Sequence, residues 1–354
     1  MLSGIARSGE RQNTLRLPPH RQQALLSAVA VFILTITPGS VSAQDLPQQS
    51  SPSAPQQPLQ VTTEIVKLDA TITDERGEFI SGLQQKDFRI LDRGAEQPIV
   101  FFAPTDAPAQ ILVMVETSPA VYLIQSDHIA AVYSLARGLA PDDEIALVTY
   151  NDAPRTILPF TQDKASLTAA LEQIQYTLGF GDLNLFDSLS AVLDSLAPAT
   201  GKKAILLLTT GLDSSPASHW DALVQKLRSS DVVIYPVALG TALRAPAKKN
   251  KNKAPSTPEP SVFAAADKTL RSLADITGGR AFFPESPSDF APMYREIAAT
   301  LRHQYLLGIA PVHDGQFHPL TAQVLDENGQ PYPAAGKNSS RKIFVREGYL
   351  APAP

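Results

Sequence analysis

The feature that most constrains the fold of this chain is an uninterrupted apolar run from Ile111 to Val115. A short apolar run bounded by turn-forming residues is typical of a β-strand that is buried on both faces. The run leads directly into Glu116, Thr117 and Ser118. Because ligands of open α/β sheets bind beyond the carboxyl ends of such strands, the sequence predicts a candidate site at these three residues.

Strand and helix patterns alternate on the carboxyl side of this run. Strands are predicted at 144–150, 203–209, 232–237 and 281–283, and a hairpin-like segment around 156–160. Amphipathic helices are predicted at 123–139, 164–178, 185–196, 220–229, 264–277 and 290–303. Pro236 lacks a backbone donor, which favours an edge position or a strand end there. The alternation predicts the fold class, an α/β domain with a doubly wound, mostly parallel sheet and helices on both faces.

The segments on either side of this domain show strand patterns only. Apolar residues alternate with polar ones over 66–73, and further strands are predicted at 87–91, 99–102, 304–309, 317–324 and 342–345. A unit of so few strands is marginally stable on its own. We therefore expect the amino- and carboxyl-terminal segments to form one small β subdomain together.

The first residues are typical of an export signal. Four arginines precede an apolar segment at 24–37, and the small-x-small cleavage pattern Val41-Ser42-Ala43 follows. The apolar segment is shorter than the roughly 18 residues that a membrane-spanning helix needs, which disfavours a membrane anchor. The mature chain, with no transmembrane segment, is therefore expected in the periplasm or outside the cell.

The predicted organisation has five parts in chain order. They are a signal peptide (1–43), a disordered linker rich in Gln, Ser and Pro (44–60), an amino-terminal β subdomain (61–103), the α/β domain (110–303, with a disordered loop insertion at 243–260) and carboxyl-terminal strands (304–350). Lysines at 248, 249, 251 and 253 form a basic run in the insertion. Without interleaved aromatic residues, this run is interpreted as a solvated loop rather than a patch for an anionic partner.

Composition excludes several classes of function. The chain contains no cysteine, so disulfide scaffolds, thiolate metal sites and cysteine nucleophiles are excluded. Its formal net charge is −5, which does not favour nucleic acid as a partner. None of the histidines of the mature chain is spaced as a zinc-ligand pair, and neither a His-Glu-x-x-His nor a Gly-x-Ser-x-Gly motif occurs.

Several short motifs along the mature chain point to one family. They are Gly82-Leu83 with Asp87-Phe88, Asp92 with Gly94, Glu116-Thr117-Ser118, Leu185-Phe186-Asp187, Leu208 to Asp213, Gln304 to Gly308, and Arg346 to Tyr349. In this order, the chain resembles the von Willebrand factor A-related proteins that are abundant in Acidobacteria. The resemblance implies a doubly wound α/β domain that binds proteins or other ligands through a metal-ion-dependent adhesion site.

The residues that the resemblance assigns to that site depart from the family pattern. Its first motif, Asp-x-Ser-x-Ser, falls on Glu116, Ser118 and Ala120, and its later Thr and Asp fall on Leu183 and Thr210. Mg²⁺ requires near-octahedral oxygen coordination, yet Ala120 and Leu183 carry no side-chain oxygen. Thr210 is neutral where a charge is expected, and Glu116 is one methylene longer than Asp.

We therefore predict a degenerate site with no metal and no other cofactor. On this interpretation, Glu116 and Ser118 finish a strand and cap the next turn. The alternative is a divalent-cation site, for Mg²⁺ or a similar ion, that has shifted onto Glu116, Ser118, Asp182 and Asp213.

The leading hypothesis is an exported, non-enzymatic protein-interaction module. Its binding surface would be the rim formed by 116–120, 181–184 and 210–213, and its partner would be an unknown protein or envelope component. The candidate binding residues are Glu116, Thr117, Ser118, Asn184, Thr210 and Asp213. Three alternatives stay open: a metal-dependent adhesion module, a structural envelope component, and a hydrolase that uses Ser118 with Glu116.

Overall fold

The computed structural model describes residues 64–105, 107–118, 125–176, 182–214, 216–239, 262–332 and 341–354. All of them belong to one compact unit, Val61–Pro354. The predicted signal peptide, the linker and the insertion at 243–260 lie outside the described residues. Within the described part of the chain, no helix is both long enough and apolar enough to cross a membrane.

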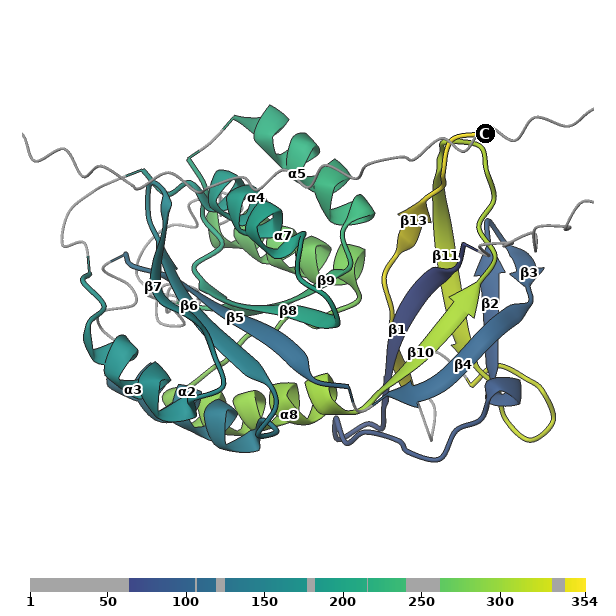
Figure 1. The fold of residues 1–354 in the computed structure, drawn as a ribbon, viewed down its shortest axis with the longest axis horizontal. Coiled ribbons are helices and arrows are strands. Elements are labelled where there is room, and N and C mark those ends of the chain that lie inside the picture. The colour runs from purple at the N-terminus through teal and green to yellow at the C-terminus, as the bar shows by residue number, and fades with distance from the viewer. Residues whose placement is uncertain are drawn as a thin grey trace, which may run out of the picture. The chain divides into compact units, whose positions relative to one another are not determined.

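A five-stranded sheet, which we call the central sheet, forms the middle of the α/β domain (Figure 1). Its order is β7 (Pro154–Thr161), β6 (Glu144–Tyr150), β5 (Ala109–Glu116), β8 (Lys202–Thr209) and β9 (Val232–Ala238). Strands β6, β5, β8 and β9 run parallel, and β7 pairs antiparallel with β6. The apolar run Ile111 to Val115 thus lies in the middle strand. Pro236 lies in the outer strand β9, which is one of the two positions that the sequence favoured.

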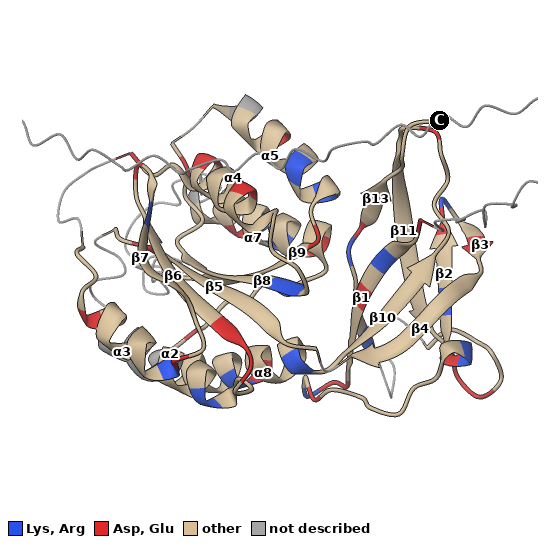
Figure 2. Ribbon diagram, viewed as in Figure 1, with Lys and Arg blue, Asp and Glu red and all other residues tan. Residues whose placement is uncertain are grey.

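Helices cover both faces of the central sheet (Figure 1). One face packs on α2 (Gln125–Gly138), α3 (Lys164–Glu172) and α8 (Phe290–Arg302); the other packs on α4 (Leu185–Leu196), α5 (Ala217–Ser229) and α7 (Val262–Thr277). Alternate residues of β5 pack in the hydrophobic cores on the two faces of the sheet. Ile111 and Val113 lie in one core, and Leu112 and Met114 lie in the other. In β5, β6 and β8, charged residues stand only at the strand ends (Figure 2). This is the pattern of strands buried on both faces.

The terminal segments form two four-stranded antiparallel sheets, which we call the β sandwich. One sheet is β12 (Lys342–Phe344), β1 (Val66–Thr73), β10 (Gln304–Ile309) and β4 (Ile99–Thr105); the other is β13 (Gly348–Leu350), β11 (Phe317–Val324), β2 (Phe88–Asp92) and β3 (Ala95–Gln97). Inward-facing residues such as Leu68, Ile90, Leu307 and Ala322 form one shared core. The predicted β subdomain of amino- and carboxyl-terminal segments is therefore confirmed.

The segment between β12 and β13 contacts the α/β domain directly. Arg228 of α5 pairs with Glu347 at 3.0 Å, and Arg346 Nη2 donates to the carbonyl of Arg228 at 2.8 Å. Gly278, just after α7, has φ +83°, and a Cβ there would lie 2.6 Å from the Arg346 amide nitrogen. Only glycine fits such a backbone angle at such a close approach without strain.

The structure departs from the predicted elements in several places. The helix predicted at 164–178 ends at Glu172, because Gln173 and Ile174 donate to Ala170 and Leu171 in a tighter final turn. The strand predicted at 281–283 is a single bridge between Phe282 and Val237. Two short 3₁₀ turns, η1 (Gln85–Asp87) and η2 (Pro287–Asp289), were not predicted.

Candidate functional site

The carboxyl ends of three neighbouring strands bring Glu116, Tyr150 and Thr209 together. Glu116 lies opposite Tyr150 in the β5–β6 register, and Thr209 ends β8 on the other side of β5. All three side chains are buried, and that of Glu116 is 0% exposed. Carboxyl ends of parallel strands meet at one edge of a sheet, so this convergence follows from the strand order.

The Glu116 carboxyl group accepts hydrogen bonds from its own chain. Its Oε2 lies 2.6 Å from the Thr210 amide nitrogen, 2.8 Å from Thr210 Oγ1 and 3.0 Å from Thr209 Oγ1. The Tyr150 hydroxyl lies 3.2 Å from the same oxygen and 2.6 Å from Thr209 Oγ1. The carboxyl group is therefore directed toward the end of β8 and is satisfied there, which a buried polar group requires.

Tyr150 acts in this network as a neutral hydroxyl. Burial and the adjacent Glu116 raise the pKa of Tyr150 well above its ordinary value. Thr209 also accepts a hydrogen bond from the Gly211 amide at 2.9 Å. The three side chains and Thr210 thus join the ends of β5, β6 and β8 to the turn after β8.

Backbone hydrogen bonds join the loops around this network, which we call the carboxyl-end rim (residues 116–118, 150–152, 182–184 and 210–214). Leu183 and Ser214 exchange two bonds, Leu183 N to Ser214 Oγ at 3.0 Å and Ser214 N to the Leu183 carbonyl at 2.7 Å. Asn184 is bonded to the 151–152 turn. Its backbone amide donates to the Asn151 carbonyl at 2.8 Å, and its Nδ2 donates to the Asp152 carbonyl at 2.9 Å. These cross-loop bonds fix the relative positions of three loops.

The rim residues near α4 also carry specific contacts. Asp213 accepts from the Phe186 amide at 2.9 Å and so caps the amino terminus of α4. Asp187, in the first turn of the helix, lies 2.7 Å from His219 Nδ1 of α5. Thr117 donates both its amide, at 3.0 Å, and its hydroxyl, at 3.1 Å, to the Tyr150 carbonyl.

The predicted binding residues differ in their exposure. Four of them are buried, namely Glu116, Thr117, Ser118 and Thr210. Asn184 and Asp213 are half-buried, and Asp182 is exposed. Residues 119, 120 and 181 of the predicted rim lie outside the described residues.

Sequence reasoning did not identify several residues of the rim. Tyr150 and Thr209 complete the buried network, and the exposed residues Asp152 and Ser214 lie beside Asn184 and Leu183. The sequence held a signal for them, because Tyr150 and Thr209 end predicted strands and Glu116 directly follows one.

The side chains present do not fit the metal site of the family. Glu116 and Thr210, at two of its ligand positions, are buried and bonded to each other, and Leu183 offers no side-chain oxygen. Ser118 keeps the family residue, and its buried Oγ has no hydrogen-bond partner among the described residues. The turn that it was predicted to cap lies outside them. One neutral oxygen and the helix-capping Asp213 fall short of octahedral coordination. No group of three or more His, Asp and Glu side chains suited to a metal occurs in the described ranges. The expectation that no metal binds stays a prediction.

The hydrolase alternative gains no support from this geometry. A general base must lie within hydrogen-bonding reach of its nucleophile, directly or through one water. No described side chain lies within hydrogen-bonding distance of Ser118 Oγ, and the Glu116 carboxyl group accepts from Thr209 and Thr210 instead. Of the histidines, His219 contacts Asp187, and the side chain of His128 is not described.

The comparison with protein families agrees with the topology. Residues 126–284 match the von Willebrand factor type A domain. The match begins after the Glu116–Ser118 segment and covers α2 through Pro284. With its central sheet between two helical layers, the chain has a von Willebrand factor type A fold, and the predicted fold class is confirmed. The acidobacterial type stays a prediction.

Solved structures with this fold are similar to the chain at low identity. A von Willebrand factor type A protein from Catenulispora acidiphila is 14% identical, with a TM-score of 0.42, over 81% of this chain and 75% of that one. The von Willebrand factor domain of the type V pili tip protein Mfa5 from Porphyromonas gingivalis is 13% identical, with a TM-score of 0.42, over 56% and 96%. An aerotolerance-related membrane protein from Bacteroides fragilis is 13% identical, with a TM-score of 0.41, over 55% and 98%. A comparison with curated protein sequences finds no match.

Proposed function

We propose that this protein is an exported, non-enzymatic interaction module that binds a protein partner at the carboxyl-end rim without a divalent metal. The observation that carries the proposal is the orientation of Glu116. Its carboxyl group is 0% exposed and accepts hydrogen bonds from Thr209 and Thr210. The residue at the first ligand position of the family thus stabilises the sheet ends, and the rim is left to bind through its outer residues.

The rim suits this role because hydrogen bonds join its loops to one another. Bonds between Leu183 and Ser214 and between Asn184 and the 151–152 turn hold the surface together. Preorganisation of this kind reduces the entropy lost on association. The exposed side chains of Asp152, Asp182 and Ser214 are available for contact with a partner. The buried candidates would then support the surface from below.

Affinity capture from the envelope fraction of the native cell tests the rim. The bait variant is Asp182→Lys, because Asp182 is exposed and its replacement leaves the buried network intact. The matched control is Asp142→Lys, which reverses an exposed charge beyond the opposite end of β6. We expect a partner that the wild type and the control retain and that Asp182→Lys loses. Equal capture by all three proteins contradicts the rim assignment.

Metal dependence is tested separately. Calorimetric titration of the full chain with Mg²⁺, Mn²⁺ and Ca²⁺ at millimolar concentrations should give no saturable heat. Capture of the partner should be the same with and without EDTA. Saturable binding of any of the three ions, or release of the partner by EDTA, favours the metal-dependent adhesion module instead.

A further inference from the structure

A cavity of about 480 Å³ lies at the amino-terminal edge of the central sheet, the edge opposite to the rim. Its walls come from the starts of β8 and β9, from β1 and β10 of the β sandwich, and from the segment between β12 and β13. Small-molecule sites are commonly about 300–1,000 Å³ in volume and often lie between domains. The cavity therefore has a suitable size and position for a small ligand.

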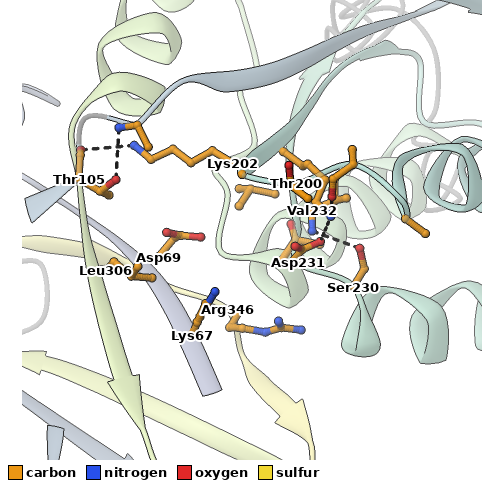
Figure 3. A pocket seen from close by; sticks show the side chains of 17 residues that line it. Lys67, Asp69, Thr105, Thr200, Lys202, Ser230, Asp231, Val232, Leu306 and Arg346 are labelled. Atoms are coloured by element: carbon orange, nitrogen blue, oxygen red, sulfur yellow. Dashed lines mark hydrogen bonds and ion pairs between the residues drawn. The ribbon is translucent and has the colours of Figure 1, made fainter. Parts of the chain in front are cut away.

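The alternation of β1 explains how charged groups reach this cavity. Leu68 and Ala70 face the core of the β sandwich and are fully buried. Successive strand residues point to opposite faces, so Lys67 and Asp69 share the other face. Both line the cavity, and Arg346 lines it from the segment between β12 and β13. Figure 3 shows the side chains of Lys67, Asp69 and Arg346 around the same open space.

Three charged groups in the cavity are not paired with one another. Among the described residues, no hydrogen bond or ion pair involves the side chain of Lys67 or Asp69. Arg346 donates to backbone carbonyls only, from Nε to Gly348 at 2.7 Å and from Nη2 to Arg228 at 2.8 Å. Elsewhere in the cavity wall, by contrast, Lys203 and Asp231 form an ion pair at 2.7 Å.

The partial removal of Asp69 and Arg346 from water indicates what a ligand in this cavity would contribute. Burial, opposed by Lys202, raises the pKa of Asp69, and burial lowers the pKa of Arg346. A charged group withdrawn from water is destabilising unless an opposite charge or hydrogen bonds compensate it. A cationic donor on a ligand would provide this compensation for Asp69. An anionic acceptor on the same ligand would meet the positive charges of Lys67 and Arg346.

We propose that the cavity binds a zwitterionic small molecule of the class of amino acids and short peptides. The ligand ammonium group lies against Asp69, and its carboxylate lies against Lys67 and Arg346. Val232, Val233 and Leu306 in the wall offer an apolar surface to the remainder of the ligand. This site is distinct from the rim and does not depend on the function proposed there.

Calorimetry on the full chain tests the ligand class. The probes are alanyl-alanine, alanyl-glutamate and alanyl-lysine, and we expect saturable binding of at least one of them at millimolar concentrations. For each dipeptide that binds, two matched analogues follow: the carboxyl amide, which lacks the carboxylate, and the N-acetyl peptide, which lacks the ammonium group. Each analogue loses one charge-assisted contact, so its affinity should be lower than that of the dipeptide by about tenfold or more.

Three variants locate the binding. Asp69→Asn keeps the shape of the side chain and should weaken the dipeptide by about tenfold, because a charge-assisted bond is lost. Lys67→Gln should weaken it by roughly threefold, since Lys67 is exposed and its charge is partly screened. The control, Lys268→Gln on the exposed side of α7, should leave affinity unchanged.

Several results overturn the proposal. One is the absence of saturable heat with all three dipeptides, and another is equal binding of either capped analogue. Tighter binding by Asp69→Asn also contradicts it, because that result describes a simple anion site. The rim variant Asp182→Lys should bind the dipeptide normally, so failure at the rim and failure at the cavity are distinguishable.

Discussion

A carboxyl group at each edge of the central sheet is held in a different way. At the carboxyl-end rim, Glu116 is enclosed and accepts hydrogen bonds from Thr209 and Thr210. At the amino-terminal edge, Asp69 faces a cavity with no hydrogen-bond or ion-pair partner in the described ranges. Through these hydrogen bonds, the Glu116 carboxyl group links the end of β5 to the end of β8. The Asp69 carboxyl group accepts no hydrogen bond from the described residues.

The comparison shows that position beyond a strand end does not by itself make a ligand site. The rim occupies the expected position in an α/β sheet, yet its central acid is bound to the protein itself. The cavity lies at the less expected edge, where a separate β layer meets the sheet and leaves charged groups unpaired. Substitutions at these two carboxyl groups should therefore differ in their effect on stability.

The largest effect is expected for Glu116→Ala. The substitution removes the buried acceptor of the Thr210 amide and of the Thr209 and Thr210 hydroxyl groups. We expect the free energy of unfolding to fall by about 4 kcal/mol, measured by urea denaturation. The control is Glu285→Ala at an exposed position, which should change stability little. A small effect at Glu116 would mean that the network does not stabilise the sheet ends.

A third buried carboxyl group, in the β sandwich, extends the comparison. Asp92 accepts from His318 Nδ1 at 2.8 Å and from the Tyr349 hydroxyl at 3.2 Å, and His318 Nε2 also lies 3.1 Å from Asp314. His318 is 3% exposed and lies within β11.

His318→Ala should therefore destabilise the protein. It leaves Asp92 buried without its principal partner, and we expect a loss of about 3 kcal/mol in urea denaturation. His313→Ala is the control, because the His313 side chain is 52% exposed and its pairing with Glu64 is on the surface. Equal losses for the two variants would show that the buried pair contributes no more than a surface one.

Tyr150→Phe should have a smaller effect than either change. The variant keeps the buried ring and removes one hydroxyl, while Thr209 and Thr210 still bond Glu116. The expected loss is about 1 kcal/mol, the usual contribution of one hydrogen bond. Tyr133→Phe, at a residue 39% exposed, serves as the control. A loss as large as that of Glu116→Ala would identify Tyr150 as the principal partner of the acid.

The smallest effect, and one of opposite sign, is expected for Asp69→Asn in the absence of ligand. Burial raises the pKa of Asp69, so the folded state holds its proton to a higher pH than the unfolded state does. Stability therefore falls as pH rises from the ordinary aspartate range through the folded pKa. Above the folded pKa the variant should melt at a higher temperature than the wild type.

The pH dependence of that difference is the decisive measurement. It should shrink as the pH is lowered toward the ordinary aspartate range, because both forms of residue 69 are then neutral. Asp142→Asn, at an exposed residue, should show no such gain. A wild type more stable than Asp69→Asn at neutral pH would indicate that Asp69 has a stabilising partner.

Much of the fold could be predicted from the sequence because the signal is local. The run Ile111 to Val115 has no polar residue and so had to be buried on both faces, as it is. Alternation over 66–73 identified the face of β1 that packs on the sandwich core. The helix 185–196 and the strands 144–150 and 304–309 have the predicted bounds, since apolar periodicity fixes both their type and their length.

The sequence by itself thus determined most of the strands and helices and the departures from the family's metal motif. Only the tertiary structure decided what each acid does, because hydrogen-bond partners come from distant parts of the chain. Glu116 is satisfied by Thr209 and Thr210 across the sheet, whereas Asp69 meets Arg346 in one cavity without pairing. The spacing of apolar residues in the sequence predicts which residues are buried. The orientation of a buried carboxyl group depends on which donors the folded chain brings within about 3 Å of it.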